Sequence, residues 1–378
     1  MHPIYLDHNS TSPLDPLVRQ TMIECYEAGY ANPASQHRAG RRAHSVLEDA
    51  RDQVRERFGL PPGQGSVIFT SGGTEANNLA ILGLSGTEPG RVLISSIEHP
   101  SVGGPAAELA RRGFDVRRIH ALASGEIDLH HFRDLLTPAT KLVSVMLANH
   151  ETGVLQPLAE VAELCHSMNV PLHTDAVQAA GYQQLDIMEL NVTALTITAH
   201  KFRGPLGIGV LVLRDTTTLL PQLFGGFHQA GLRPGTESVA LAVSLARALE
   251  LCHSRRSSHV SHVTQLRDHF ESLLLEELPA TVINGRGARR LPQTSNVSFP
   301  GVNRQALFMA LDLAGLACST GSACASGSSE PSPVLLAMGL SPEIVEGALR
   351  FSFSPTIAAS DAAEAARRIL ACYHNLRP

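Results

Sequence analysis

Residues 66–78 read SVIFTSGGTEANN. The apolar, β-branched run at its start predicts a buried strand, and Gly72-Gly73 before Thr74 and Glu75 predicts a tight turn into a helix. A helix that begins where a strand ends offers free backbone N–H groups and the positive end of its dipole to an anion. The segment therefore predicts an anion cradle, with a plain N-capped turn as the alternative. The nucleotide patterns GxGxxG and GxxxxGK[ST] are absent from the chain.

Similar apolar runs alternate with helical stretches up to about residue 255. The predicted strands are 66–70, 91–95, 141–147, 170–174, 194–198 and 209–213, and helical periodicity is found between them, for example at 75–84 and 158–168. Continuous apolar strands separated by helices are typical of a mostly parallel sheet with both faces covered. This part of the chain is predicted to be an α/β domain.

The pattern changes after a long predicted helix at about 236–278. A shorter β run at 294–299, helices at 303–316 and 332–339, and a closing strand and helix within 347–375 predict a second, smaller domain. We expect a large cofactor-binding domain over residues 15–255, and a small domain formed by residues 1–14 and 256–378.

Composition narrows the class of protein. The 378 residues are 43% hydrophobic and 17% charged, which is enough for a large core and favours two domains. The net charge of −5 and the lack of a long basic run argue against nucleic acid as a ligand. The N-terminus has neither a charged leader nor an apolar stretch, and Asp312 interrupts the apolar segment 306–318, so we expect neither export nor membrane insertion.

The cysteines and histidines point to neither a disulfide framework nor a metal site. Six cysteines are scattered without a CxxC pair, and the 18 histidines include no HExxH pattern. We therefore expect no metal, and a reducing, cytoplasmic location.

Two further strand ends carry polar groups suited to one cofactor. Asp175 follows the strand at 170–174, where it is either a helix N-cap or a carboxylate facing the crevice at the strand ends. Lys201 follows the strand at 194–198 and precedes a Gly-Pro turn; most lysines are solvated surface residues, but a buried amine here can form a Schiff base. An anion cradle, a carboxylate and a lysine in this order are what a pyridoxal phosphate enzyme needs.

Ordered motifs over nearly the whole chain make the sequence similar to a known family. It resembles the cysteine desulfurases of the nitrogen-fixation and iron-sulfur-cluster type, within the class V aminotransferase superfamily. The motifs lie at 5–7, 32–37, 70–78, 98–100, 149–153, 175–178, 199–201, 231–237, 319–327 and 350–352. The resemblance implies pyridoxal-phosphate fold type I, the aspartate aminotransferase-like fold, with a seven-stranded, mostly parallel sheet and a smaller α+β domain.

The resemblance also implies a role for each matching residue. Lys201 is then the Schiff-base lysine, Asp175 the partner of the pyridine nitrogen, and Gln178 the partner of the phenolic oxygen. His99 stacks on the ring and moves protons, which suits imidazole because its charge changes near neutral pH. The phosphate is held by Gly73, Thr74, Thr198 and His200, and by Thr236 from the neighbouring subunit of a homodimer.

The same resemblance assigns the substrate groups. Cys324 lies among Gly, Ser and Ala in the stretch 319–329, whose composition also favours mobility, so no apolar packing partner is apparent from the sequence. In the family this cysteine takes the sulfur of L-cysteine as a persulfide, leaving alanine, and passes it to an acceptor protein. Arg350 and Asn32 match the residues that hold the substrate, with a surface salt bridge as the alternative for Arg350. Cys318 is expected in the core.

The chain departs from the family pattern in several places. His150 stands in Asn149-His150-Glu151 where the family has a second asparagine, so His150 fills the cofactor-facing amide slot. Thr198 replaces a serine and keeps the hydroxyl, Pro234 replaces another serine, and His8 stands in an asparagine position. The sequence ends at Pro378, without the tail by which relatives dock a scaffold protein, which leaves the sulfur acceptor open.

Three other functions remain as alternatives. A selenocysteine lyase shares the fold and cofactor but has no need of Cys324. Another class V aminotransferase or amino-acid lyase would use Lys201 and Asp175 and give no reason for Cys324. A catalytically silent sulfur-carrier or assembly platform predicts the loss of Lys201 or Cys324, and both residues are present.

Overall fold

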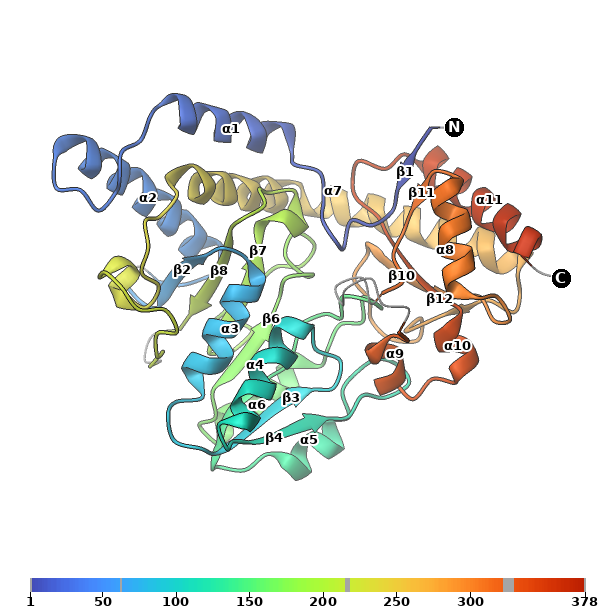
Figure 1. Ribbon diagram of the computed structural model, residues 1–378, viewed down its shortest axis with the longest axis horizontal. Coiled ribbons are helices and arrows are strands. Elements are labelled where there is room, and N and C mark those ends of the chain that lie inside the picture. The colour runs from blue at the N-terminus through green and yellow to red at the C-terminus, as the bar shows by residue number, and fades with distance from the viewer. Residues whose placement is uncertain (1, 62, 215–217, 322–329, 377–378) are drawn as a thin grey trace.

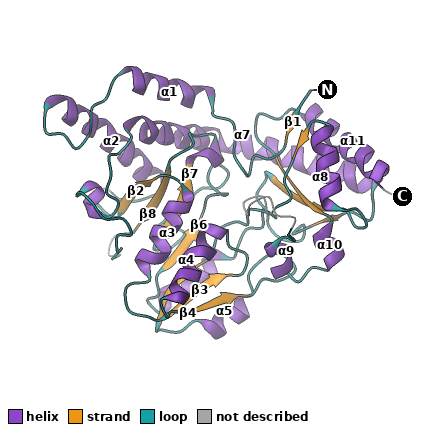
Figure 2. Ribbon diagram, viewed as in Figure 1, coloured by secondary structure: helices purple, strands orange, loops and turns teal. Residues whose placement is uncertain are grey.

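The larger part of the molecule is built around a seven-stranded sheet (Figures 1 and 2). The computed structural model describes residues 2–61, 63–214, 218–321 and 330–376. The strand order is β2 (Ser66–Thr70), β8 (Gly209–Leu213), β7 (Ala194–Thr198), β6 (Leu172–Asp175), β5 (Thr140–Ser144), β3 (Arg91–Ser95) and β4 (Asp115–Ile119). Only β8 runs antiparallel to its neighbours. The predicted mostly parallel seven-stranded sheet is confirmed.

Apolar side chains cover both faces of this sheet because successive residues of a strand point to opposite sides. Val67 and Phe69 belong to one core cluster and Ile68 to another. The first cluster includes side chains of α1 (Pro16–Glu27), α2 (Arg38–Arg57), α5 (Leu129–Leu135), α6 (Leu158–Ser167) and α7 (Val239–Glu277). The second is covered by α3 (Gly73–Leu84) and α4 (Pro100–Arg111).

A second group of elements has its own core. It contains the antiparallel sheet β12 (Ala348–Ser352), β10 (Thr294–Ser298) and β9 (Val282–Ile283), and the parallel pair β1 (Ile4–Tyr5) and β11 (Leu316–Ala317). Its helices are α8 (Arg304–Leu313), α9 (Pro333–Ala337), α10 (Pro342–Glu346) and α11 (Ala359–Leu376).

The long helix α7 joins the two parts of the molecule (Figure 1). Its residues up to Leu251 pack in the core of the large sheet, whereas Val263 and those beyond it pack in the core of the second group. Ile4 and Leu6 also belong to the second core. We propose the division into residues 15–255, and residues 1–14 with 256–378, on this basis.

Several elements differ from the sequence prediction. The strand predicted at 141–147 ends at Ser144, although the N–H groups of Val145 and Leu147 still donate to carbonyls of the neighbouring strand segment. The edge strand β4 was missed because three of its five residues are charged and it lacks an apolar run. Cys318 is buried, as expected, at 7% exposure. Among the described residues, no helix is both long and apolar enough to span a bilayer.

Candidate active site

A cavity of about 240 Å³ lies where several strands of the large sheet end. Strands β2, β3, β5, β6 and β7 run in the same direction, so their carboxyl ends meet along one edge. The cavity is lined by Ser10, Gly73, Thr74, Asn77, His99, Ser101, Met146, Ala148, His150, Asp175, Val177, Gln178, Thr198, His200 and Lys201. Segments far apart in the sequence are therefore brought to one site.

The N-terminus of α3 lies at the cavity, where the sequence predicts an anion cradle. The helix begins at Gly73, directly after β2, so the N–H groups of its first turn lack intrahelical partners and face the cavity edge. The backbone is tightly packed there, since a Cβ on Gly209 would lie 2.5 Å from the carbonyl carbon of Gly72. Thr198 and His200 lie beside the cradle. Burial lowers the pKa of His200 to about 4, which keeps its imidazole neutral.

Asp175 is a buried carboxylate at the end of β6. Its Oδ2 accepts a hydrogen bond from Asn77 Nδ2 at 2.7 Å, and its Oδ1 accepts from the N–H of Val177 at 2.9 Å. The second bond closes a turn, and no helix lies among the described residues between Asp175 and β7, so the helix N-cap that the sequence allowed as the alternative is not formed. Both contacts fix the carboxylate in place, while 6% of the residue remains exposed beside the cavity.

The amine of Lys201 is held by the N-terminal segment. Nζ donates to the carbonyls of Asn9 at 2.6 Å and Ser10 at 2.7 Å, and Gln178 Nε2 donates to the Asn9 carbonyl at 3.0 Å. Lys201 lies in the short helix η1 (Ala199–Phe202) directly after β7. The N-terminal segment thus orders the lysine at the cavity.

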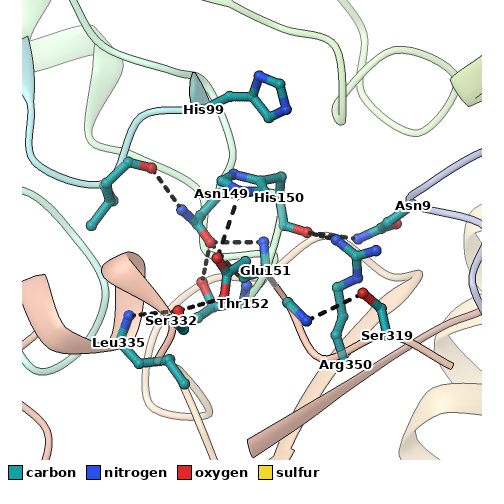
Figure 3. Close-up of polar contacts among 12 residues, drawn as sticks. Asn9, His99, Asn149, His150, Glu151, Thr152, Ser319, Ser332, Leu335 and Arg350 are labelled. Carbon is teal, nitrogen blue, oxygen red and sulfur yellow. Dashed lines mark hydrogen bonds and ion pairs between the residues drawn. The ribbon is translucent and has the colours of Figure 1, made fainter. Parts of the chain in front are cut away.

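Two imidazoles of the cavity lining lie next to each other (Figure 3). The rings of His99 and His150 are edge-to-face, with centroids 5.2 Å apart. His99 Nδ1 accepts from the N–H of Ser101 at 3.1 Å and lies 2.7 Å from its hydroxyl. Burial lowers the pKa of both rings, and the nearby cations Lys201 and Arg350 lower them further. Both rings are therefore neutral near pH 7.

Three predicted site residues that the structure describes do not line the cavity. Arg350, in the middle of β12 and 5% exposed, donates to Asp7 Oδ1 at 2.7 Å and to the carbonyl of His150 at 3.0 Å, so it forms a buried rather than a surface ion pair. Asn32 is exposed in the loop between α1 and α2, and Thr236 is exposed before α7. A fourth predicted residue, Cys324, lies outside the described residues.

The chemistry of the donor set fits pyridoxal phosphate. The helix N-terminus suits a phosphate, the Asp175 carboxylate suits a protonated ring nitrogen, and the Lys201 amine suits a carbonyl. Asn77 Oδ1 and His150 Nδ1 are buried and have no hydrogen-bond partner among the described residues, so they can accept from or donate to a bound group. The described residues contain no group of three or more His, Cys, Asp or Glu arranged to hold a metal.

Comparison with known proteins agrees with this geometry. The aminotransferase class-V family matches residues 4–364. The chain belongs to the aminotransferase class-V family. Enzymes of this family use pyridoxal phosphate.

Relatives within the aminotransferase class-V family are similar over most of their length. "Cysteine desulfurase IscS" of Dictyoglomus turgidum is 35% identical, over 92% of this chain and 89% of that protein. "Cysteine desulfurase NifS" of Azotobacter vinelandii is 36% identical, over 94% and 88%. The X-ray structure of a NifS-like protein from Rickettsia africae has a TM-score of 0.90 at 30% identity, and the match covers 99% of this chain and 100% of that one.

Some cavity residues of this class-V chain were missed by sequence reasoning. Asn77, in the segment 66–78, is not among the predicted site residues, yet it contacts Asp175. Its position four residues after Gly73 places it on the same helix face as the cradle, which is the signal that could have identified it. Ser10 and Ser101 carry no such signal, because only the fold brings them to the cavity.

Proposed function

We propose that this protein is a cysteine desulfurase, which converts L-cysteine to L-alanine and transfers the sulfur to its own Cys324. The observation that carries the proposal is the cavity itself. It gathers a helix N-terminus, a buried carboxylate, a lysine amine and a neutral imidazole at one sheet edge. Relatives named cysteine desulfurase over about nine-tenths of the chain support the choice of substrate.

We assign the cofactor contacts to residues of the cavity. Gly73, Thr74, Thr198 and His200 would hold the phosphate, Asp175 the ring nitrogen and Gln178 the phenolic oxygen, while His150 would fill the cofactor-facing amide slot. Lys201 would bind the carbonyl carbon as a Schiff base. When bound, the cofactor supplies an electron sink for bonds at the substrate's α and β carbons.

The chain's own residues would then orient the substrate and move protons. The guanidinium of Arg350 suits a carboxylate because it presents paired donors, and Asn32 is assigned beside it from its matching motif. Neutral His99 can accept a proton and return it to carbon. The N-terminal segment holds Lys201 next to the same space.

Cys324 would carry out the sulfur transfer. Its thiolate attacks the substrate sulfur, the bond between that sulfur and the β carbon breaks, and the carbon takes a proton to give alanine. The sulfur remains on Cys324 as a persulfide, so no external oxidant is needed. An acceptor protein in an iron-sulfur-cluster or thiolation pathway would remove it.

A homodimer would complete the site. Thr236 is exposed and is not among the residues lining its own chain's cavity, which suits a contact with the cofactor phosphate of a neighbouring subunit. The loop before it carries Phe224 and Phe227, which are 88% and 86% exposed in the single chain. A second copy of the chain would cover such rings.

The decisive experiment compares sulfide and alanine release from L-cysteine under reductant for the wild type and for Cys324→Ala. We expect equal amounts of both products from the wild type and none from the variant, while the variant still binds the cofactor. Activity of both proteins on L-selenocysteine with little on L-cysteine would instead identify a selenocysteine lyase. Sulfide release by Cys324→Ala at the wild-type rate would contradict the proposed persulfide.

A further inference from the structure

The turn at Asn149–Gly153 carries a side chain that lines the cavity next to one that does not. His150 lines the cavity, whereas Glu151 is buried behind it at 1% exposure (Figure 3). Asn149 fixes the turn, since its Oδ1 accepts from the N–H groups of Glu151 and Thr152, both at 2.9 Å, and its Nδ2 donates to the carbonyl of Ile97 at 3.0 Å. A rigid turn therefore sets the position of the Glu151 carboxylate relative to the cofactor cavity.

The carboxylate of Glu151 contacts the chain on both sides of residues 322–329. After them, Ser332 Oγ donates to Glu151 Oε2 at 2.6 Å and accepts from the N–H of Leu335 at 3.1 Å, so it also caps α9. Before them, Gly321 approaches so closely that a Cβ would lie 2.5 Å from Glu151 Oε2, and its φ of +84° is in the left-handed region.

Apolar packing also holds the segment after residues 322–329 against the cavity wall. Val334, Leu335 and Met338 form a core cluster with Ile97 and Met146, which follow β3 and β5. Met146 also lines the cavity. Ser319 exchanges backbone hydrogen bonds with Arg350, at 3.0 and 2.7 Å. The chain that flanks residues 322–329 is thus attached to the cavity wall at several points, and Glu151 contacts both flanks.

Burial of this carboxylate requires a reason. Burial raises the pKa of Glu151, while Ser332 and the cations Arg350 and Arg304 lower it. His150 Nε2 lies 3.7 Å from Oε1, too far for a hydrogen bond. A buried acid is costly even when it is hydrogen-bonded, and an apolar residue would fill the same space at lower cost.

We propose that Glu151 is a positioning residue for Cys324. By holding Gly321 and Ser332 against the turn that carries His150, it sets the point from which the thiol must reach the cavity. This rests on the proposed desulfurase function. Glu151 itself is not among the residues that line the cavity.

The test compares Glu151→Ala and Glu151→Gln with the wild type as holoenzymes. Glu151→Ala is expected to lower kcat for sulfide release about tenfold or more, the effect of losing one buried charge-assisted hydrogen bond, with little change in KM for L-cysteine. Glu151→Gln, which can still accept from Ser332, should recover part of the loss. Cofactor absorbance and its change on adding L-cysteine should match the wild type in both.

Matched variants separate positioning from general damage. Ser332→Ala should reproduce the loss, and combining it with Glu151→Ala should add little, because both break one contact. Glu271→Gln is the control: Glu271 is another buried acid, which accepts from Ser295 Oγ at 2.8 Å and pairs with Arg290, and none of these residues lines the cavity, so it should leave kcat within about twofold. The proposal would be overturned if the losses of kcat in Glu151→Ala and Ser332→Ala were additive in the double variant. It would also be overturned if the loss of kcat followed a loss of cofactor occupancy or a fall in melting temperature.

A readout independent of turnover distinguishes this inference from the proposed function. The rate of Cys324 alkylation by iodoacetamide, located by mass spectrometry, should differ between the wild type and Glu151→Ala and be unchanged in Glu271→Gln. If the wild type releases no sulfide but the alkylation rates differ, the desulfurase proposal fails and the positioning role stands. Equal alkylation rates, together with unchanged kcat where turnover is seen, would refute the positioning role.

Discussion

His99 and His150 show how the environment of a residue decides its chemistry. Two imidazoles 5.2 Å apart cannot both be protonated without strong repulsion, and burial with nearby Lys201 and Arg350 disfavours the cation of each. The negative charge of Asp175 raises the pKa of His99, but burial lowers this pKa by more. Both rings are thus available at neutral pH to accept hydrogen bonds or protons.

We predict from this that the acid limb of the kcat profile lies below pH 6.5. The pKa of His99 is lowered in the folded protein, so its neutral form persists as the pH falls to 6.5, and activity is lost only as the pH drops through the lowered pKa. His99→Gln should lower kcat by about a hundredfold or more and remove this limb. The pH dependence of sulfide release in both proteins is the measurement, and a limb centred above pH 6.5 would contradict the assignment.

At the scale of elements, β8 lies close against the start of α3, which we propose holds the cofactor phosphate. Gly209 in β8 has no room for a side chain, since its Cβ would meet the backbone of Gly72. The geometry of the helix N-terminus is therefore set by a strand that contributes no side chain to the cavity.

We predict that Gly209→Ala weakens pyridoxal phosphate binding about tenfold or more by displacing the first turn of α3. Titration of the apoenzyme with the cofactor, followed by absorbance, measures this. Gly103→Ala is the control, because Gly103 lies in α4 with no neighbouring side chain or segment within 4 Å of the place that a Cβ would take, and alanine there should stabilise the helix by about 0.5–1 kcal/mol. Equal cofactor affinity in the two variants would show that the cradle tolerates the shift.

At the scale of the whole molecule, α7 connects two cores, and the cavity depends on both. Asn9 illustrates this: its carbonyl accepts from Lys201 and Gln178, while its side chain donates to Thr294 Oγ1 at 2.8 Å and its N–H to Ser352 Oγ at 2.9 Å. Movement between the two groups of elements would therefore alter the contacts of the lysine.

The proposed homodimer leads to a prediction about mixed subunits. Lys201→Ala should be inactive, and Thr236→Asp should be nearly so because it places a charge beside the phosphate of the neighbouring site. When the two variants are unfolded together and refolded, half of the dimers should contain one subunit of each. In such a mixed dimer one site has both an intact Lys201 and an intact Thr236, so about a quarter of all sites should be active. Sulfide release by the mixture measures this, with sedimentation to confirm the dimer. A mixture no more active than its components would show that Thr236 is not shared.

Local sequence carried most of the fold prediction. The apolar runs of β2, β3, β7 and β8 ended where predicted, because a buried strand needs a continuous apolar segment and a turn at its end. The edge strand β4 and the two-residue strands β1, β9 and β11 escaped prediction, since their pairing is decided by distant partners rather than by their own composition.

The sequence by itself determined the class of site, because Gly73, Asp175 and Lys201 each follow a recognisable strand and parallel strands bring their ends to one edge. Only the tertiary structure decided which groups those residues meet. The contacts from Lys201 to Asn9 and from Glu151 to Ser332 join residues 192 and 181 positions apart, and such pairings leave no local periodicity in a single sequence. Their physical basis is burial, since each polar group removed from water must find a partner wherever the fold supplies one.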